Sequence, residues 1–310
     1  MGEVPQLWTM TGSDGEDGVV VDRLSPEESF ERLAHDIRLQ TILTLDDDGP
    51  LSHAALRERV GVDDPGQFNY HLRKLDGRFV RDDGDGYDLT AAGRRVVGAV
   101  LSGGYTADLA GDTVPADADC LRCGGPLETH LAYGGVYVTC NECGQTFNDV
   151  EMPPSALEGS DPSEIYGLVD RWAKRRLTAA QYGFCHRCDG PIDQRVRRAT
   201  EDVWEEGIPG WLADLPVEAV LEHRCTRCEE QRYSLVAAVA ALEPAVASFH
   251  HEHGVDVRET PLTDLDWLEM GVTTVESTDP LVVTVPVTLD DETLVVSFDA
   301  DFSLVDERRR

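Results

Sequence analysis

Lysine is almost missing from this chain of 310 residues, in which it occurs only as Lys74 and Lys174. Long apolar runs are missing as well. No stretch approaches the run of about eighteen apolar residues that a membrane-spanning helix needs. Residues 1–22 are acidic and glycine-rich, unlike the apolar core of a secretory signal. These absences predict a cytoplasmic protein with no membrane attachment and a flexible amino terminus over residues 1–22.

Positive charge is scarce: 59 acidic residues against 27 basic ones give a formal net charge of −32. Such a chain repels itself in dilute buffer, whereas concentrated salt screens the repulsion between carboxylates. The composition resembles that of halophilic proteins from the cytosol of haloarchaea. We therefore interpret the acidity as an adaptation to salt, and it does not argue against a nucleic-acid partner.

No cysteine stands outside a Cys-x-x-Cys pair. Two residues between two cysteines let one tight turn aim both sulfurs at one ion, and two such pairs complete a tetrahedral site. The loop inside the first predicted site has 16 residues, as in a zinc ribbon, and the loop inside the second has 36. The sequence thus predicts two Zn²⁺ per chain, each bound by four cysteines: Cys120, Cys123, Cys140 and Cys143 in one site, Cys185, Cys188, Cys225 and Cys228 in the other.

The two predicted sites are similar to each other, because Cys120-Leu-Arg-Cys-Gly-Gly-Pro-Leu-Glu recurs as Cys185-His-Arg-Cys-Asp-Gly-Pro-Ile-Asp. This repeat indicates a duplicated ribbon. Disulfides are the alternative, but they suit small secreted scaffolds better than a chain of this length. Iron in a rubredoxin-like site remains an alternative to zinc at the first site, where Gly124 and Gly144 follow the two pairs.

Residues 23–101 carry a pattern of helices followed by a hairpin. Ser25-Pro26-Glu27-Glu28 combines a capping box with proline at the first helical position. Further helical runs cover residues 39–45, 51–60 and 65–75, a hairpin turns at residues 83–86, and Thr90 caps a last helix. The run over 65–75 buries Phe68, Leu72 and Leu75 on one face. Its opposite face is polar, with Gln67, Asn69, Tyr70, Arg73 and Lys74.

This order and three motifs resemble the winged helix-turn-helix of ArsR-type transcriptional regulators: Asp36-Ile37-Arg38-Leu39, Phe68-Asn69-Tyr70-His71-Leu72 and Tyr87-x-Leu89-Thr90-x-x-Gly93. The resemblance implies that Asn69, Tyr70, Arg73 and Lys74 enter the major groove of double-stranded DNA, with His71 at the helix margin. It also implies a homodimer that matches a two-fold operator. Arg57 and Arg78 lie at positions suited to phosphates.

The chain departs from the ArsR pattern at three places, the smallest of which is Thr41, where the family usually has an aliphatic residue. Residues 51–60 lack the thiol pair of the family's metal sensors, so we expect no metal sensing there. The hairpin carries acidic residues that would face phosphates with the wrong sign: Asp82, Asp83, Asp85 and Asp88.

Local charge favours a polyanion partner for this region. Residues 51–81 contain six basic and four acidic residues, a net charge of +2, so the remainder of the chain carries −34. We interpret this stretch as the one locally positive segment, and it coincides with the predicted DNA-binding helix.

The rest of the chain divides into a linker (102–119), the first ribbon (120–152), a connecting helix (153–184), a second four-cysteine module with a helix over 233–253 (185–253) and a carboxy-terminal β-hairpin region (254–310). Pro286 is expected on an edge strand. We expect Lys174-Arg175-Arg176 to form a solvated helix face, and His250-His251-x-His253 to be a helix cap or polar surface and not a metal site.

The predicted fold class is α+β and multidomain. The sequence has no nucleophile elbow, phosphate loop or His-Glu-x-x-His helix, so we expect no enzyme. The predicted function is that of a DNA-binding transcriptional regulator whose zinc ribbons pack, dimerise or sense a signal. The alternative is a zinc-ribbon adaptor that binds proteins of the transcription or RNA machinery without reading sequence.

Overall fold

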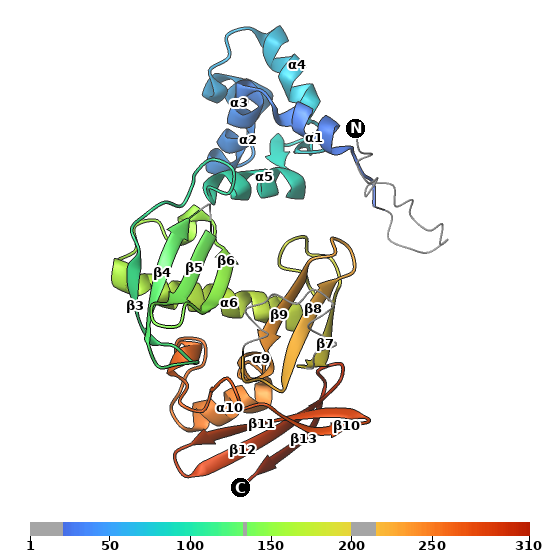
Figure 1. Ribbon diagram of the computed structural model, residues 1–310. Helices are drawn as coiled ribbons and strands as arrows, with labels where there is room; N and C mark the ends of the chain where they lie inside the picture. The colour runs from blue at the N-terminus through green and yellow to red at the C-terminus, as the bar shows by residue number, and fades with distance from the viewer. Residues whose placement is uncertain (1–20, 133–134, 200–214) are drawn as a thin grey trace, which may run out of the picture. The chain divides into compact units, whose positions relative to one another are not determined.

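The structure is a computed structural model that describes residues 21–132, 135–199 and 215–310 (Figure 1). The chain forms two compact units, Met1–Leu101 and Ser102–Arg310. This division coincides with the end of the helix-rich segment predicted from the sequence. The acidic segment expected over residues 1–22 lies, up to residue 20, outside the described residues.

The first unit consists of helices and one small antiparallel sheet. Its helices are α1 (Pro26–Leu33), α2 (Asp36–Asp48), α3 (His53–Val60), α4 (Pro65–Leu75) and α5 (Ala91–Leu101). Between α4 and α5, strand β1 (Val80–Asp82) pairs with β2 (Tyr87–Leu89). The helices therefore precede and follow a two-stranded hairpin, as the sequence pattern predicts.

Local signals in the sequence set the ends of these helices. The side chains of Ser25, Ser52 and Asp64 accept hydrogen bonds from backbone N–H groups in the first turns of α1, α3 and α4. Close packing requires a glycine at position 93 of α5, since a Cβ there would lie 2.2 Å from the carbonyl oxygen of Phe79. The buried core of this unit comprises Ile42, Leu45, Leu56, Val62, Phe68, Leu72, Leu75, Phe79, Val80, Leu89 and Val97.

The described residues of the second unit form three antiparallel sheets. The first has the order β3 (Val114–Asp119), β4 (Pro126–Ala132), β5 (Gly135–Cys140) and β6 (Thr146–Glu151). The second has the order β7 (Ile192–Arg198), β8 (Ala219–Cys225) and β9 (Gln231–Leu235). The third has the order β10 (Thr274–Thr278), β11 (Leu281–Leu289), β12 (Glu292–Asp299) and β13 (Leu304–Arg309).

Helix α6 (Ile165–Gln181) contacts the first two sheets and is seen behind them in Figure 1. Ile165, Tyr166 and Val169 belong to the same buried cluster as Val136 and Val138 of β5. Near the other end of α6, Leu177 packs against the cluster that contains the second sheet.

The second four-cysteine module and the carboxy-terminal sheet share one core, although the sequence divides them at residue 253. Helices α9 (Val236–Ala240) and α10 (Pro244–Glu252) contribute Val239 and Phe249 to that core. Leu221 of β8 and Val296 of β12 belong to the same cluster. The described parts of residues 185–310 consequently share this core, because neither sheet covers its apolar face alone. A smaller cluster comprises Leu215, Val220 and Met270.

Three sequence predictions in this unit need correction. Residues 114–119 of the predicted linker form β3, which pairs with β4. The helix predicted over 233–253, which Pro244 is expected to kink or divide, begins only at Val236, because residues 233–235 belong to β9. It is divided into α9 and α10, and Pro244 occupies the first turn of α10, where its missing N–H costs no hydrogen bond. Pro286 is not on an edge strand, because β11 lies between β10 and β12. β10 pairs with residues 281–284 of β11, so Pro286 lies beyond its end.

Candidate metal centres and nucleic-acid interface

The four Cys-x-x-Cys turns share one backbone pattern. In each turn the N–H of the first cysteine donates to the carbonyl five residues later, as from Cys120 to Gly125 and from Cys185 to Gly190, both at 2.8 Å. The residue after the second cysteine adopts positive φ and donates back to the first cysteine. Gly124 and Gly144 hold that position in the first site, whereas Asp189 and Glu229 hold it in the second.

The sulfurs of each site lie at the vertices of a small tetrahedron. In the first site the Sγ atoms of Cys120 and Cys143 are 3.7 Å apart, and those of Cys123 and Cys140 are 3.6 Å apart. The second site has equivalent separations of 3.8 Å and 3.6 Å. A tetrahedral ion with metal–sulfur bonds of about 2.3 Å requires an edge of about 3.8 Å. A disulfide would require about 2.05 Å.

Each cluster can therefore hold one metal ion, and all four sulfurs of each cluster lie within 4.8 Å of one another. The spacing prediction of two four-cysteine clusters is confirmed in the described part of the chain. The eight thiols are not disulfide-bonded.

The turns favour the thiolate form at one cysteine of each site. Burial raises the pKa of the Cys140 thiol, but hydrogen bonds from the N–H groups of Cys143 and Glu142 and from the thiols of Cys123 and Cys143 together outweigh burial and lower that pKa to about 7. The Cys225 thiol of the second site likewise has a pKa of about 7. Burial raises the pKa of Cys120 to about 12. Metal binding displaces the remaining protons, so metal affinity falls as the pH is lowered.

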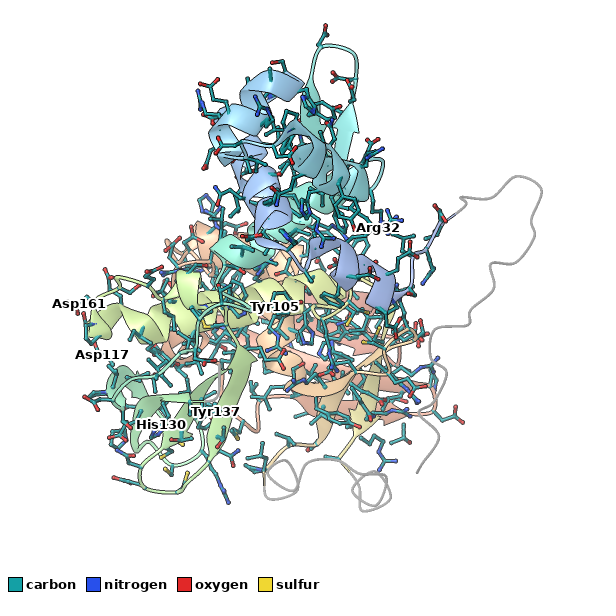
Figure 2. The ribbon with its side chains drawn as sticks, turned by 90° about the horizontal axis from the view of Figure 1, so that it is seen from above. Arg32, Tyr105, Asp117, His130, Tyr137 and Asp161 are labelled. Atoms are coloured by element: carbon teal, nitrogen blue, oxygen red, sulfur yellow. The ribbon has the colours of Figure 1, made fainter. Side chains whose placement is uncertain are left out.

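The two modules are also equivalent in strand register. Leu127 of β4 pairs with Cys140, and Ile192 of β7 pairs with Cys225 in the same way. His130 and Tyr137, labelled in Figure 2, are paired across β4 and β5. Arg195 and Glu222 are the corresponding pair in the second module. Arg195, like His130, is ten positions after the first cysteine of its module, and Glu222, like Tyr137, is three positions before the third. The duplication inferred from the sequence repeat thus extends to the backbone.

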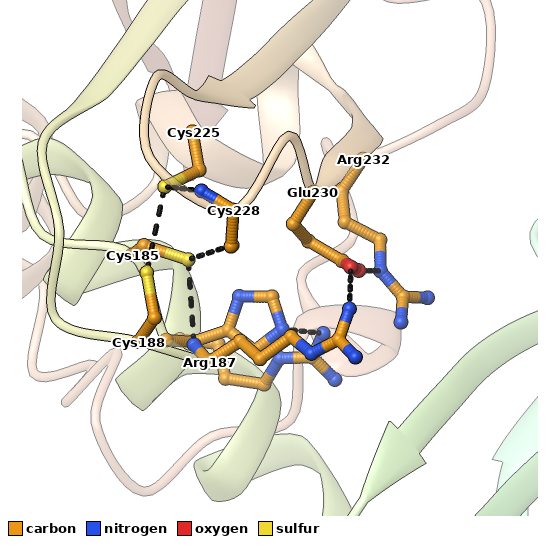
Figure 3. Close-up of polar contacts among 9 residues, drawn as sticks. Cys185, Arg187, Cys188, Cys225, Cys228, Glu230 and Arg232 are labelled. Atoms are coloured by element: carbon orange, nitrogen blue, oxygen red, sulfur yellow. Dashed lines mark hydrogen bonds and ion pairs between the residues drawn. The ribbon is translucent and has the colours of Figure 1, made fainter. Parts of the chain in front are cut away.

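Around the second cluster, charged side chains form a network (Figure 3). The Glu230 carboxylate accepts from Arg187 at 3.0 Å and from Arg232 at 2.7 Å. The backbone N–H of Arg187 lies 3.4 Å from the Cys185 sulfur. This carboxylate links the first turn of the second module to strand β9.

The outward face of α4 presents the residues that the sequence predicts for DNA contact. Tyr70 is 54% exposed, whereas Phe68 on the opposite face is fully buried. Lys74 Nζ lies 6.0 Å from the centroid of the Tyr70 ring, and Arg73 Nε donates to the carbonyl of Asn69 at 3.2 Å. The predicted contact residues on this helix are all exposed: Gln67, Asn69, Tyr70, Arg73 and Lys74.

Three other predicted residues have different environments. Arg57 is half-buried and donates to the carbonyls of Val62 and Asp63, so it holds the α3–α4 loop. Arg78 is also half-buried. His71, expected at the helix margin, is buried, and its ring lies 3.9 Å from that of His35. Burial lowers the pKa of His71.

The β1–β2 hairpin is less acidic at its surface than the sequence suggests. Asp88 is buried and pairs with Arg81 at 3.0 Å and Arg94 at 3.2 Å. Its carboxylate stabilises the packing of the hairpin on α5 and is not directed at a ligand. Asp82, Asp83 and Asp85 remain exposed near the tip.

The family model described as domain of unknown function (DUF7351) matches residues 117–304, which contain both cysteine clusters and most of the carboxy-terminal sheet. The chain belongs to this family. The model described as domain of unknown function (DUF7347) matches residues 26–100, the helices and hairpin of the first unit. No curated protein and no solved structure matches the chain. In the described residues, no helix is long and apolar enough to cross a membrane.

The DUF7351 region contains a positive segment that the sequence prediction missed. Residues 171–198 contain eight basic and two acidic residues, a net charge of +6, which exceeds the +2 of residues 51–81. The prediction of a single locally positive segment is therefore wrong. A running sum of charge along the sequence would have revealed it. The basic residues are Arg171, Lys174, Arg175, Arg176, Arg187, Arg195, Arg197 and Arg198.

Proposed function

We propose that the protein is a transcriptional regulator that reads double-stranded DNA with helix α4. The observation that carries the proposal is the two-faced character of α4. Its apolar face is buried in the core of the first unit, while its other face exposes amide, phenol, guanidinium and ammonium groups. These groups are the ones that pair with base edges and phosphates.

The elements around α4 support the same proposal. Helix α3 precedes α4, and the β1–β2 hairpin follows it before α5, which is the order of a winged helix-turn-helix. In that interpretation Asn69, Tyr70 and Arg73 contact bases, and Lys74 and Arg78 contact phosphates. Arg57 supports the loop between α3 and α4 and takes no part in DNA binding. A homodimer would then place two α4 helices on a two-fold operator.

We further propose that both cysteine clusters are structural zinc ribbons. Four thiolates leave no open coordination position for water or substrate, so the role of the metal would be to stabilise the module. Iron is the alternative at the first site, since four thiolates suit either metal. Elemental analysis together with visible absorbance distinguishes them: two zinc ions in a colourless protein support the proposal, and a red protein identifies iron.

The DNA proposal is tested in two steps. Genome-wide immunoprecipitation identifies candidate operators, and polarisation titrations then compare one operator with a scrambled duplex of the same length. We expect tighter binding to the operator, and we expect Arg73→Ala to reduce the difference. Equal affinities that Arg73→Ala leaves unchanged would instead support the protein-binding adaptor.

A further inference from the structure

The second cysteine module carries a hollow of about 340 Å³ beside its metal centre. It lies on the face of β7 and β8 that points away from the shared core, and three arginines line it: Arg195, Arg197 and Arg224. Cys225 and Thr226 line it as well, so the hollow reaches the second cysteine turn. Its carboxylates are Asp193, Glu222 and Glu229.

One of these arginines is fixed and two remain available. The buried Glu222 carboxylate accepts from Arg197 Nε at 2.6 Å and from Gln231 at 2.5 Å, so Arg197 neutralises a charge inside the protein. Arg195 is paired only loosely with Asp301, at 3.9 Å, and both side chains are exposed. Arg224 is exposed and forms no ion pair within the described residues. Arg227, next to Thr226 in the same turn, is also exposed and also forms no ion pair within the described residues.

The first cysteine module serves as an internal comparison, because the two backbones are equivalent position by position. The position before the third cysteine is Thr139 in the first module and Arg224 in the second. Within the following turn, Glu142 lies against Gly125, and Arg227 lies against Gly190 in the same way. The ribbon therefore folds without arginine at these positions, so the fold does not account for the arginines of the second module.

Aromatic residues distinguish the modules in the same manner. Asp119 bridges to Pro126 before the first cluster, and Phe184 bridges to Pro191 at the equivalent position before the second. Phe184 is 56% exposed and Tyr182 is 76% exposed. Phe184 and the turn that carries Arg227 both contact Pro191, since Phe184 bridges to it and the N–H of Thr226 donates to its carbonyl at 3.0 Å. Surfaces that bind nucleic acid combine such exposed rings, which stack on bases, with arginines that bind phosphates.

We infer that this arginine-rich face of the second cysteine module binds the phosphodiester backbone of a nucleic acid. Arg195, Arg224 and Arg227 supply the phosphate contacts, and Phe184 contacts sugar or base. The contact is additional to base reading by α4 and does not depend on it. The chain as a whole repels a polyanion, since its net charge is −32, whereas at the hollow three arginines balance three carboxylates and Arg227 adds a positive charge.

The test uses the full chain and gives the second module two residues of the first: Arg224→Thr with Arg227→Glu. Both residues are already tolerated by the ribbon at the equivalent positions. Affinity for a scrambled duplex is measured at several potassium chloride concentrations. Each lost phosphate contact reduces the slope of log affinity against log salt by about 0.9, so we expect the slope to fall by roughly 2. Arg197 is left in place, because its removal would strand the buried Glu222 carboxylate.

The matched control is Arg122→Glu, a charge reversal on the first module, which should leave the slope unchanged. Arg224→Lys with Arg227→Lys retains the charge and should keep most of the slope. Metal content and thermal unfolding show whether each variant is folded. If Arg224→Thr with Arg227→Glu does not fold, the single variant Arg224→Gln replaces it in the titrations. An unchanged slope in a folded variant that retains its metal would overturn the inference.

The experiment also distinguishes this inference from the proposed function. The arginine variants should weaken operator and scrambled duplex alike and leave their ratio unchanged, whereas Arg73→Ala should change the ratio. Affinities measured for single-stranded DNA, RNA and duplex DNA of equal length show which nucleic acid the arginine-rich face binds. Phe184→Ala should weaken binding to the single strands alone if the ring stacks on bases.

Discussion

Trp267 donates its indole N–H to Nε2 of His250 at 2.9 Å. Nδ1 of the same imidazole lies 2.8 Å from the carbonyl oxygen of Val246. A neutral imidazole has one donor and one acceptor nitrogen, so Nδ1–H donates to Val246 and Nε2 accepts from Trp267. His250 is fully buried. Both ring nitrogens are thus engaged in the core, and His250 is neither the cap nor the polar surface predicted from the histidine cluster.

This arrangement makes stability depend on pH. Burial lowers the pKa of His250 below its ordinary value of 6.5. The unfolded chain therefore takes up a proton that the folded chain does not, and stability is lost as the pH falls below about 6.5 towards the folded pKa. His250→Leu should remove this part of the pH dependence. It also leaves the buried indole N–H of Trp267 unpaired, at a cost of about 1–3 kcal/mol.

Chemical denaturation in concentrated potassium chloride at several pH values measures both effects. The pKa values of His71, His186 and His223 are lowered as well. The His250→Leu protein should therefore keep the part of the pH dependence of stability that these three histidines contribute. Trp267→Phe is the matched control, since it removes the donor and leaves the histidine to titrate. A variant at position 250 with the wild-type pH profile would contradict this explanation.

Local signals made much of the fold predictable. Ser25, Asp64 and Thr90 each cap the helix that follows them, because a short polar side chain satisfies N–H groups in the first turn wherever the rest of the chain lies. The cysteine clusters were predictable for the same reason, since each pair is built by one short turn. The recurrence of the sequence around Cys120 at Cys185 indicated the second cluster, although its loop is longer.

What the sequence could not show depends on residues distant along the chain. His250 is buried by Trp267, and Lys174 by a loop some 86 residues away. Arg57, predicted as a phosphate ligand, donates to the carbonyls of Val62 and Asp63. Neither hydrophobic periodicity nor local charge encodes such partners, so the sequence predicts that these polar residues lie at the surface.

Lys174, predicted to lie on a solvated helix face, is buried. It forms a salt bridge with Asp170 at 2.5 Å, and both side chains are only 6% exposed. Lys174 also donates to the carbonyl of Thr260, while Asp170 accepts from the N–H of Leu262. The pair therefore attaches helix α6 to the loop that precedes the carboxy-terminal sheet.

We predict that Lys174→Met destabilises the second unit by about 3–5 kcal/mol, because it leaves the Asp170 carboxylate buried without its partner. The double variant with Asp170→Leu should cost less than the single one. Arg175→Met, one residue away and exposed, is the control and should have little effect. In denaturation curves, Asp170→Leu alone completes a double-mutant cycle with the wild type, Lys174→Met and the double variant. Equal losses of stability for Lys174→Met and Arg175→Met would disprove the structural role.

Removal of one metal ligand should affect one site at a time. Cys123→Ser and Cys188→Ser are each expected to reduce the bound zinc from two ions to one per chain and to destabilise the second unit. The first unit contains no cysteine and has its own core, so a fragment covering residues 23–101 should fold without metal. Elemental analysis and circular dichroism measure these outcomes. Loss of both metals from either variant would show that the two modules fold as one.

Arg57 and Arg73 allow the structural and the DNA-binding roles of the first unit to be separated. Arg57 holds the α3–α4 loop through the carbonyls of Val62 and Asp63, and hydrogen bonds from a charged donor contribute about 1.5–3 kcal/mol. Arg57→Ala should therefore lower the free energy of unfolding. Arg73 is exposed on α4, and among the described residues its Nε bonds only to the carbonyl of Asn69 within its own helix. Arg73→Ala should leave stability unchanged and cost about 1–3 kcal/mol in operator binding.

Unfolding and DNA titration of the same two variants give opposite expected patterns. Arg57→Ala, once conditions restore full folding, should bind the operator with the wild-type ratio of specific to non-specific affinity, because its side chain is directed into the loop. Arg73→Ala should retain non-specific affinity and lose selectivity at one base pair of each half-site. If Arg57→Ala loses selectivity while folded, or Arg73→Ala unfolds, then α4 does not read DNA in the orientation that its buried Phe68, Leu72 and Leu75 impose.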